Sequence, residues 1–414
     1  MEPAKDSMSR AQSSQYLPPG WRLVHFGDVV RNINANVRDP LESELERFVG
    51  LDHLDPESLH IKRWGLIEDG TTFTRKFVTR QVLFGKWRAY QRKVAVAEFD
   101  GICSGDILVF EPANDQLLPE LLPFIVQSDG FFEHALGTSA GSLSPRTKWQ
   151  DLARYEFALP PQDEQRRIAE ILWAADETLE QWSECLSKAD QFRRSSLSTL
   201  VLQGIGHKRF KDDAIGLIPI TWRVAKISAV GKVQLGRQRA PKYQTGTCTH
   251  PYLRVANVFD GYLDLGDVLS MDFDERDYER YKLWSGDILL NEGQSRELVG
   301  RSCIYRDEIK GCCFQNTLIR FRPSADLLPE YAQGYFQYAF YQGEFARIAR
   351  QTTSIAHLGA DRFAELSMPV PPLSEQVDIV KCLNAANESW SQMRSHRNNT
   401  LDLRNALLNR LLAV

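Results

Sequence analysis

The sequence lacks the long apolar runs and the paired cysteines that mark several protein classes. It contains no run of about 18 apolar residues, which argues against a membrane-spanning helix. The 7 cysteines are scattered and never spaced Cys-x-x-Cys, so we expect neither a disulfide framework nor a zinc finger, but a reducing cytoplasm. Residues 1–15 are polar and lack the apolar core of a secretory signal, so we expect a flexible leader.

The motifs of common catalytic sites are also missing. There is no Gly-x-x-x-x-Gly-Lys-Ser/Thr phosphate loop, no His-Glu-x-x-His motif and no Asn/Asp-Pro-Pro-Tyr/Phe methyltransferase motif. His53 and His60 stand near acids, but no second cluster completes a metal-ligand set, so we interpret them as loop residues. Asp106 and Asp287 lack the Glu-x-Lys companion of nucleases and are typical of turns. We predict no catalytic residue and no metal site.

The most informative feature that is present is an internal repeat. The 414 residues are enough for two or three domains, and 43% of them are hydrophobic, as in globular proteins. Several segments recur in the same order in both halves, namely residues 19–22 with 219–223, 104–108 with 285–289, and 159–165 with 370–376. Coincidence supplies one such match but not a series in register. We therefore predict two homologous halves with different insertions.

Each half ends in a segment that predicts a long helix. Residues 163–203 and 374–413 contain no proline, and each follows Pro-Pro and carries an early Glu-Gln. Asp163 and Ser374 are the expected N-caps. Apolar residues recur in steps of four and three, and an offset of 211 superimposes the two patterns, which is typical of coiled-coil packing.

The connectivity makes the predicted helix pair antiparallel, because the first helix leads into the second domain and the second helix must run back to pack on it. Helices of about 40 residues would be about 60 Å long. Polar entries such as Arg193, Arg397 and Arg404 weaken the far half of the pattern, where we expect a domain or a partner to cover the helices. In the alternative arrangement, each helix packs only on its own domain.

The distribution of charge is more informative than the net charge of −4. Residues 70–97 contain no acid and interleave aromatic residues with Arg75, Lys76, Arg80, Lys86, Arg88, Arg92 and Lys93. Residues 214–259 again contain no acid, but do contain Arg223, Lys226, Lys232, Arg237, Arg239, Lys242 and Arg254. Such windows favour a surface that faces a polyphosphate. Alternatively, acids from distant sequence balance these charges in space.

Two basic domains joined by long helices are consistent with a bipartite reader of duplex DNA. Half-sites on one face of B-DNA lie about 34 Å apart or a multiple of that distance, which is the scale of the predicted helices. The different insertions in the two domains then imply different half-sites with an unread gap between them.

Specific segments also resemble a known family. The doubled Pro-Pro-x-x-Glu-Gln-x-x-Ile, the repeated Ser-Gly-Asp-Ile-Leu, and residues 84–108, 291–301 and 315–320 are similar to type I restriction–modification specificity subunits, over residues 16–414. The resemblance implies two target-recognition domains alternating with two spacer helices. It also implies assembly with two modification (methyltransferase) subunits and with translocating restriction subunits. S-adenosylmethionine, ATP and Mg²⁺ would then bind to those partners, with no cofactor on this chain.

The combined prediction is an α+β protein with two similar mixed α/β domains, separated by a pair of long antiparallel coiled-coil helices and related by a pseudo-two-fold repeat. The predicted parts are a leader (1–15), recognition domain 1 (16–160), spacer helix 1 (161–206), recognition domain 2 (207–370) and spacer helix 2 (371–414).

We predict a non-catalytic, cytoplasmic DNA-specificity subunit that does not bind membranes. Its predicted DNA-facing residues are the seven cations of the first window together with Arg237, Arg239, Lys242, Arg254, Arg296 and Arg301. Other classes stay open: a self-sufficient nuclease or methyltransferase, a structural coiled-coil adaptor, or the specificity module of another phage-defence system.

Overall fold

The chain forms two compact units in a computed structural model that describes residues 17–139, 146–351 and 354–412, apart from the side chain of Lys242. Unit 1 combines the chain up to Glu184 with the segment from Ser395 onwards, and unit 2 is the stretch between them. The predicted leader, residues 1–15, lies outside the described residues. Among the described helices, none is both long enough and apolar enough to cross a bilayer.

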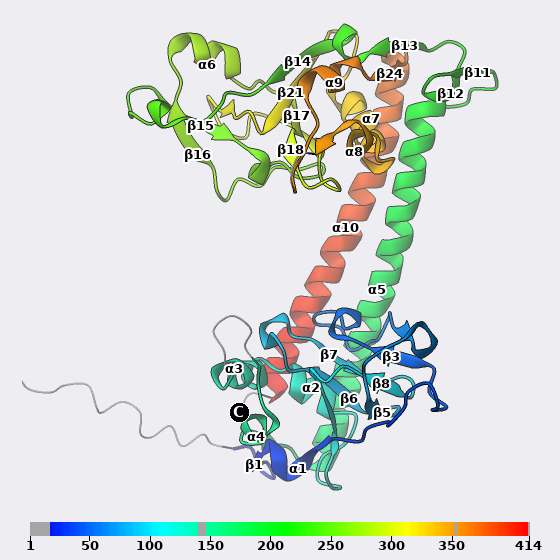
Figure 1. Ribbon diagram of the computed structural model, residues 1–414, viewed down its shortest axis with the longest axis vertical. Helices are drawn as coiled ribbons and strands as arrows, with labels where there is room; N and C mark the ends of the chain where they lie inside the picture. Colours follow the sequence, from blue (N-terminus) through cyan, green and yellow to red (C-terminus); the bar gives the residue numbers. More distant parts are fainter. Residues whose placement is uncertain (1–16, 140–145, 352–353, 413–414) are drawn as a thin grey trace, which may run out of the picture. The chain divides into compact units, whose positions relative to one another are not determined.

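Unit 1 is built on two four-stranded sheets (Figure 1). The first is antiparallel, with the order β2 (Val30–Ile33), β9 (Ile107–Pro112), β6 (Val82–Gly85), β7 (Val94–Val96). The second is mixed, with the order β4 (Gly65–Leu66), β3 (Arg47–Val49), β8 (Gly101–Cys103), β5 (Arg75–Phe77). The other elements are the paired strands β1 (Arg22–His25) and β10 (Glu156–Leu159) and the helices α1 (Phe26–Val29), α2 (Leu122–Gln127), α3 (Asp129–Gly137) and α4 (Trp149–Leu152).

Unit 2 repeats this plan. Its four-stranded antiparallel sheet has the order β14 (Gly231–Leu235), β21 (Leu318–Pro323), β17 (Ile288–Asn291), β19 (Ser302–Ile304). Two three-stranded sheets follow, β16 (Leu269–Asp272), β15 (Thr249–Leu253), β20 (Cys313–Phe314) and β18 (Gly293–Gln294), β23 (Ala356–His357), β22 (Arg350–Gln351). The remaining elements are the pair β13 (Arg223–Lys226) and β24 (Ser367–Val370), the hairpin β11 (Phe210–Asp213) and β12 (Gly216–Pro219), and the helices α6 (Glu275–Tyr281), α7 (Pro329–Tyr341), α8 (Glu344–Ile348) and α9 (Ala360–Glu365).

Aromatic side chains fill the core between the main sheet of unit 1 and its helices. The Phe84 ring lies 5.8 Å from Phe110 on the neighbouring strand and meets Phe131 of α3 edge-on at 5.6 Å. All three side chains are fully buried. Because burying one such ring contributes about 1.5–3 kcal/mol, this cluster fixes the helices on the sheet.

Equivalent strands place the repeat at offsets that differ in part from those read in the sequence. β13 begins 201 residues after β1, β17 begins 206 residues after β6, and β21 begins 211 residues after β9. The identical pentapeptides at 104–108 and 285–289 are therefore not equivalent, because the first enters β9 and the second enters β17. The sequence-based prediction that these two pentapeptides are equivalent was wrong. A short turn before a buried strand selects similar residues wherever it occurs.

Residues 79–83 are the true counterpart of residues 285–289, as their polar contacts indicate. Gln81 is buried and donates from Nε2 to Glu111 at 2.6 Å. At the equivalent positions, buried Asp287 accepts from Nε and Nη2 of Arg322 at 2.6 and 2.7 Å. At this turn, unit 1 thus has a hydrogen-bond donor that faces an acid, and unit 2 has an acid that faces a base.

The two long helices are α5 (Gln162–Gln203) and α10 (Leu373–Leu412). Each begins one residue before the expected N-cap, so Asp163 and Ser374 lie in the first turn and those two predictions were wrong. The reason is that the carbonyls of Pro161 and Pro372 already accept the first intrahelical bonds.

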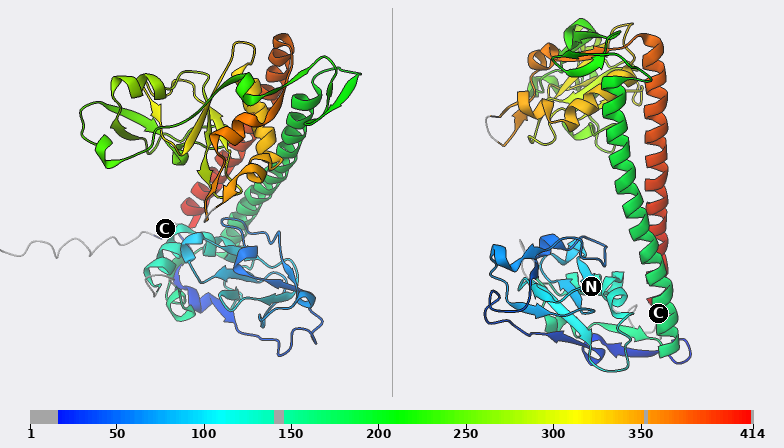
Figure 2. Two further views of the ribbon diagram at one scale, coloured as in Figure 1. Left: turned by 45° about the horizontal axis from the view of Figure 1, so that its top comes forward. Right: turned by 90° about the vertical axis from the view of Figure 1, so that its right-hand side faces the viewer.

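Within each unit, the start of one long helix packs beside the end of the other (Figures 1 and 2). Ile168 of α5 and Leu408 of α10 share the core of unit 1, and Leu197 of α5 and Ile379 of α10 share that of unit 2. The helices are therefore antiparallel. The predicted fold class, two similar mixed α/β domains with a pair of long antiparallel helices, is confirmed.

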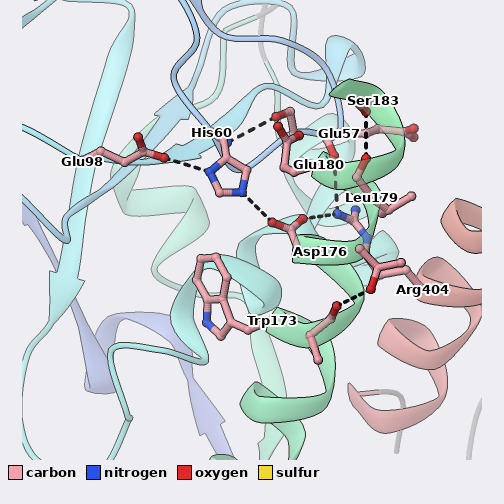
Figure 3. A network of polar contacts seen from close by, with 12 residues as sticks. Glu57, His60, Glu98, Trp173, Asp176, Leu179, Glu180, Ser183 and Arg404 are labelled. Atoms are coloured by element: carbon pink, nitrogen blue, oxygen red, sulfur yellow. Dashed lines mark hydrogen bonds and ion pairs between the residues drawn. The ribbon is translucent and has the colours of Figure 1, made fainter. Parts of the chain in front are cut away.

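The polar positions of the helix pair in unit 1 form a network that is buried at Arg404 and Asp176 and reaches the surface at Glu98 (Figure 3). Arg404 is 2% exposed and donates to Asp176 at 2.9 Å and to Gln127 at 3.2 Å. His60 bridges Asp176 and Glu98 at 2.9 and 2.8 Å. Since both neighbours of His60 are carboxylates, both of its ring nitrogens donate and the ring is a cation. As expected from the sequence, the α/β domain covers this part of the helix pair.

In unit 2 the equivalent arginine is Arg193, which has different partners. It donates to Asp190 at 2.8 Å, one turn earlier in the same helix, and to the Tyr341 hydroxyl at 3.3 Å. Asn387 is the counterpart of Asp176 and accepts at 3.4 Å. The guanidinium also lies 5.4 Å from the centre of the Trp390 ring.

Candidate nucleic-acid interface

Two cations of the first basic window (residues 70–97) are held by groups from outside that window. Arg92 pairs with Asp129 at 2.8 Å. Lys93 donates from Nζ to the carbonyl oxygen of Leu51 at 2.6 Å. These two side chains connect parts of unit 1, so their charges are already engaged inside the domain.

Three other cations gather around a single carboxylate, Asp106. Arg146 binds it through Nε and Nη2 at 3.1 and 3.3 Å. Arg75 donates to the carbonyl oxygen of Ile107 at 2.9 Å. Burial, and next the charge of Arg75, lower the pKa of the Lys86 ammonium below its usual value, and Arg146 lowers it further. The cluster has a positive charge excess, which an anion or an acceptor-rich ligand would relieve.

The remaining cations of this window lie nearer the surface, and within the described residues they form no ion pair. Lys76 is half-buried and its charge helps to lower the pKa of Asp100, after two hydrogen bonds from Thr79. Arg80 is exposed with a φ of +74°, in the turn where unit 2 has Gly286. The Arg88 guanidinium lies 4.4 Å from the centre of the Trp87 ring.

The second basic window (residues 214–259) also contains engaged cations. The Arg237 side chain is 7% exposed and pairs with Asp277 at 2.6 Å. Arg254 pairs with Asp267. Acids from outside the window thus neutralise these two cations, which is the arrangement that the sequence left open as an alternative.

Other predicted cations of unit 2 are more accessible. Arg239 and Arg296 are exposed, and no described residue forms an ion pair with either. Arg301 is half-buried with its guanidinium 4.8 Å from the centre of the Phe259 ring. The side chain of Lys242 lies outside the described residues. DNA binding by all the predicted residues stays a prediction.

The two histidines that resembled metal ligands have other roles. The Gly50 amide donates to Nδ1 of His53 at 3.1 Å, and His60 belongs to the ion-pair network of the helix pair. No cluster of three or more His, Cys, Asp or Glu suited to a metal ion is found in the described part of the chain.

Sequence reasoning missed a place in unit 1 where three segments meet beside the positive cluster, which we call the crossing. The Lys86 amide donates to the Asp106 carbonyl at 2.9 Å, and the Thr147 amide donates to the Lys86 carbonyl at 3.1 Å. Trp87 and Arg146 form a β-bridge. The crossing therefore fixes the backbone at Arg146 and Thr147.

Unit 2 has the same crossing. The Glu292 amide donates to the Thr317 carbonyl at 2.9 Å, and the Leu358 amide donates to the Glu292 carbonyl at 2.8 Å. Gly293 pairs with His357 between β18 and β23. The backbone bonds match those of unit 1 one for one.

The side chains at the two crossings differ in chemistry. Arg146 pairs with Asp106 in unit 1, and its counterpart His357 pairs with Glu292 at 3.0 Å in unit 2. The offset between Arg146 and His357 is 211, the same offset that aligns the helices. Extending that offset upstream from the helices would have found both positions in the sequence.

The protein thus belongs to a class in which an α/β domain and a long helix occur twice in one chain, with an equivalent crossing in each half. A family model described as the type I restriction modification DNA specificity domain matches residues 71–184 and 219–402. These matches cover more than half of the sequence, so the chain belongs to this family.

Several relatives agree with this membership. The chain is 26% identical to the EcoDI specificity subunit of Escherichia coli over 209 residues, which is 47% of this chain and 45% of that relative. It thus spans about half the length of that protein. It is 24% identical to the E. coli EcoKI specificity subunit over 97% of this chain and 89% of that one, and 23% identical to the MjaVIII specificity subunit of Methanocaldococcus jannaschii over 96% and 93%.

Two solved structures share the fold. A chain from a study of complex assembly in the type I R-M system superimposes with a TM-score of 0.60, at 19% identity over 95% of this chain and 98% of that one. The S subunit of a type I restriction–modification system from M. genitalium gives a TM-score of 0.54, at 13% identity over 98% of both chains.

Proposed function

We propose that this chain is the DNA sequence-specificity subunit of a type I restriction–modification complex, and that each α/β domain reads one half of a bipartite target in double-stranded DNA. One observation supports this most strongly: the two domains have the same backbone at the crossing but different side chains there. A duplicated scaffold with different polar groups is suited to reading two different short sequences.

The accessible cations supply the sequence-independent part of binding. They are Lys76, Arg80, Arg88, Arg239 and Arg296. If the assembled complex makes about six to ten phosphate contacts, its affinity for DNA falls about 10³- to 10⁵-fold between about 50 and 200 mM salt. Binding that does not respond to salt would contradict this part of the proposal.

Partner subunits supply the chemistry. Two modification subunits would bind the long helices, one on each unit, where exposed apolar side chains lie on the helix surfaces, including Ile171 and Leu403 in unit 1 and Phe192 and Val377 in unit 2. These subunits and the translocating restriction subunits would bind S-adenosylmethionine, ATP and Mg²⁺. The chain itself would be non-catalytic and would act in the cytoplasm, together with the DNA.

Mapping of methylated positions tests this function. DNA from cells that express the chain with its modification partner is sequenced for methylated bases. We expect a split motif with a fixed gap. A continuous motif, or methylation without sequence preference, would contradict the bipartite reading. Methyl transfer or cleavage by the purified chain alone would contradict the non-catalytic role, and a structural adaptor would give no DNA affinity even with its partners.

A further inference from the structure

The residues at position 146 of unit 1 and position 357 of unit 2 share three properties. Both sit at the crossing on equivalent backbone. Both are half-exposed, with 57% of the Arg146 side chain and 48% of the His357 side chain accessible. Each is oriented by a less exposed carboxylate, Asp106 in one case and Glu292 in the other. A side chain that is held in place yet reaches solvent is preorganised to contact a ligand.

The chemistry of Arg146 is that of a donor. Its Nε and Nη2 are bound by Asp106, and its Nη1 has no hydrogen-bond partner among the described residues. A guanidinium has no acceptor, so its ligand must present acceptors. On a DNA base edge the strongest acceptor pair is O6 and N7 of guanine. The nearby charges of Arg75 and Lys86 favour the same kind of ligand.

The chemistry of His357 is different. Its Nδ1 lies 3.0 Å from Glu292, and a carboxylate can only accept, so Nδ1 carries a proton. In the tautomer that this contact selects, the second ring nitrogen, Nε2, is an acceptor, and no described residue binds it. Gly293 leaves room for this ring, because a Cβ built there would lie 3.3 Å from the ring carbon Cε1. The matching ligand is an amino group, such as N4 of cytosine or N6 of adenine.

A phosphate contact does not explain both crossings. Phosphates carry the same charge at every step of the duplex, so a position that faced them would need a cation in each domain. Unit 2 instead has Glu292 where unit 1 has Lys86, and a carboxylate repels phosphate. Base edges differ from one another in donors and acceptors, so they account for both chemistries.

We propose that Arg146 and His357 are the equivalent specificity-determining residues of the two domains. Arg146 reads a guanine in one half-site, and His357 reads a base with an exposed amino group in the other. Asp106 and Glu292 are their positioning residues. This inference rests on the proposed function, and it adds which side chain reads each half-site.

The test compares methylation motifs of the complete complex carrying Arg146→Gln or His357→Leu with the wild-type motif. Each variant is expected to relax the preference at one position of one half-site, by about 5- to 150-fold, and to leave the other half-site unchanged. Asp106→Asn and Glu292→Gln should relax the same positions. The matched controls are Arg154→Gln and Lys226→Gln, which remove exposed cations away from the crossings and should leave the motif unchanged.

The outcomes separate this inference from the function on which it rests. If the wild type gives no split motif, the proposed function fails. If the wild type gives a split motif but Arg146→Gln lowers methylation evenly at all sites, Arg146 contacts the phosphate backbone of the DNA and the inference is wrong. An unchanged motif for both variants also overturns it. Thermal unfolding of each variant identifies misfolding, in which case Arg146→Lys, which keeps the charge but loses the fork, is expected to give the same relaxed position.

Discussion

The two units stabilise equivalent arginines of the helix pair, Arg404 and Arg193, in different ways. In unit 1, Arg404 depends on Asp176, which belongs to the other long helix and is shared with His60 of the α/β domain. In unit 2, Arg193 depends mainly on Asp190 of its own helix. The first arrangement joins three segments that are far apart in sequence, and the second is mostly local. We therefore expect the stability of unit 1 to fall more than that of unit 2 when one partner of its arginine is lost.

The largest expected difference follows from removing each arginine. Arg404→Ala leaves the Asp176 carboxylate, which is 4% exposed, without its guanidinium, and breaking such a buried pair costs about 3–5 kcal/mol. Arg193→Ala leaves Asp190, which is 27% exposed and keeps Arg194, so we expect about 1.5 kcal/mol. Urea-induced unfolding of the full chain measures both. Equal losses of unfolding free energy would show that the surroundings of Arg404 and Arg193 do not differ as described.

The next effect is a dependence of stability on pH that comes from His60, which contacts the Arg404–Asp176 pair of unit 1, whereas Arg193 of unit 2 contacts Tyr341. The hydrogen bond to Asp176 is the main cause that raises the pKa of His60 from 6.5 to about 9, against the opposing effect of burial. A pKa raised by folding contributes stability that is complete below about pH 6.5 and is lost as the pH rises through about 9.

His60→Gln separates this contribution from the other titrating groups. Between pH 6.5 and 9.5 the wild type should lose roughly 2 kcal/mol more than the variant, less than the full shift implies because the ring is 30% exposed. The free energy of unfolding, measured by urea at each pH, gives the comparison. Parallel curves for the two proteins would mean that His60 does not titrate in this network.

A smaller difference concerns the Glu of the two Pro-Pro-x-x-Glu-Gln motifs. Glu375 is 17% exposed and accepts from Nε1 of Trp222 at 2.9 Å and from His207 at 2.6 Å. Its counterpart Glu164 lies on the helix surface and pairs with Arg167 at 3.3 Å, with no second ion pair among the described residues. Glu375→Gln should therefore cost about 1–2 kcal/mol and Glu164→Gln less than about 0.5 kcal/mol. The melting temperatures of the two variants rank them, and a lower value for Glu164→Gln would reverse the comparison.

The smallest expected effect is on DNA binding by single surface cations. Arg88→Gln in unit 1 and Arg239→Gln in unit 2 each remove one charge without breaking an ion pair among the described residues. If each contacts one phosphate, the slope of log affinity against log salt for the assembled complex should fall by about 0.9. Each variant should weaken its own half-site in competition with DNA altered at the other. Damage to both half-sites by one variant would contradict the separate domains.

The fold was largely predictable because its signals are periodic or repeated. Steps of four and three in the apolar pattern predicted the helices. The Pro-Pro-x-x-Glu-Gln motif marked their starts, because its glutamine makes the same hydrogen bond to the backbone in both units. Gln165 and Gln376 are both buried, and they accept from the amides of Leu118 and Leu328 at 2.9 and 2.8 Å. The short match at 104–108 misled because five residues before a strand carry no information about which strand follows.

The candidate interface was less predictable. A window without acids does not exclude acids in space, as the pairs of Arg92 and Arg237 with acids outside their windows demonstrate. Ion pairs between distant segments depend on tertiary packing, which charge counting along the chain does not contain. Arg146 and His357 were missed for the same reason, since the carboxylates that orient them come from other segments.

The sharing of α10 between the units has a consequence for biosynthesis. Leu408 belongs to the core of unit 1, yet a ribosome adds it only after every residue of unit 2. The α/β domain that is synthesised first is therefore the last whose core can close. Until then its apolar surface for α10 stays open, so the nascent chain would need a chaperone, or fast completion of translation, to avoid aggregation.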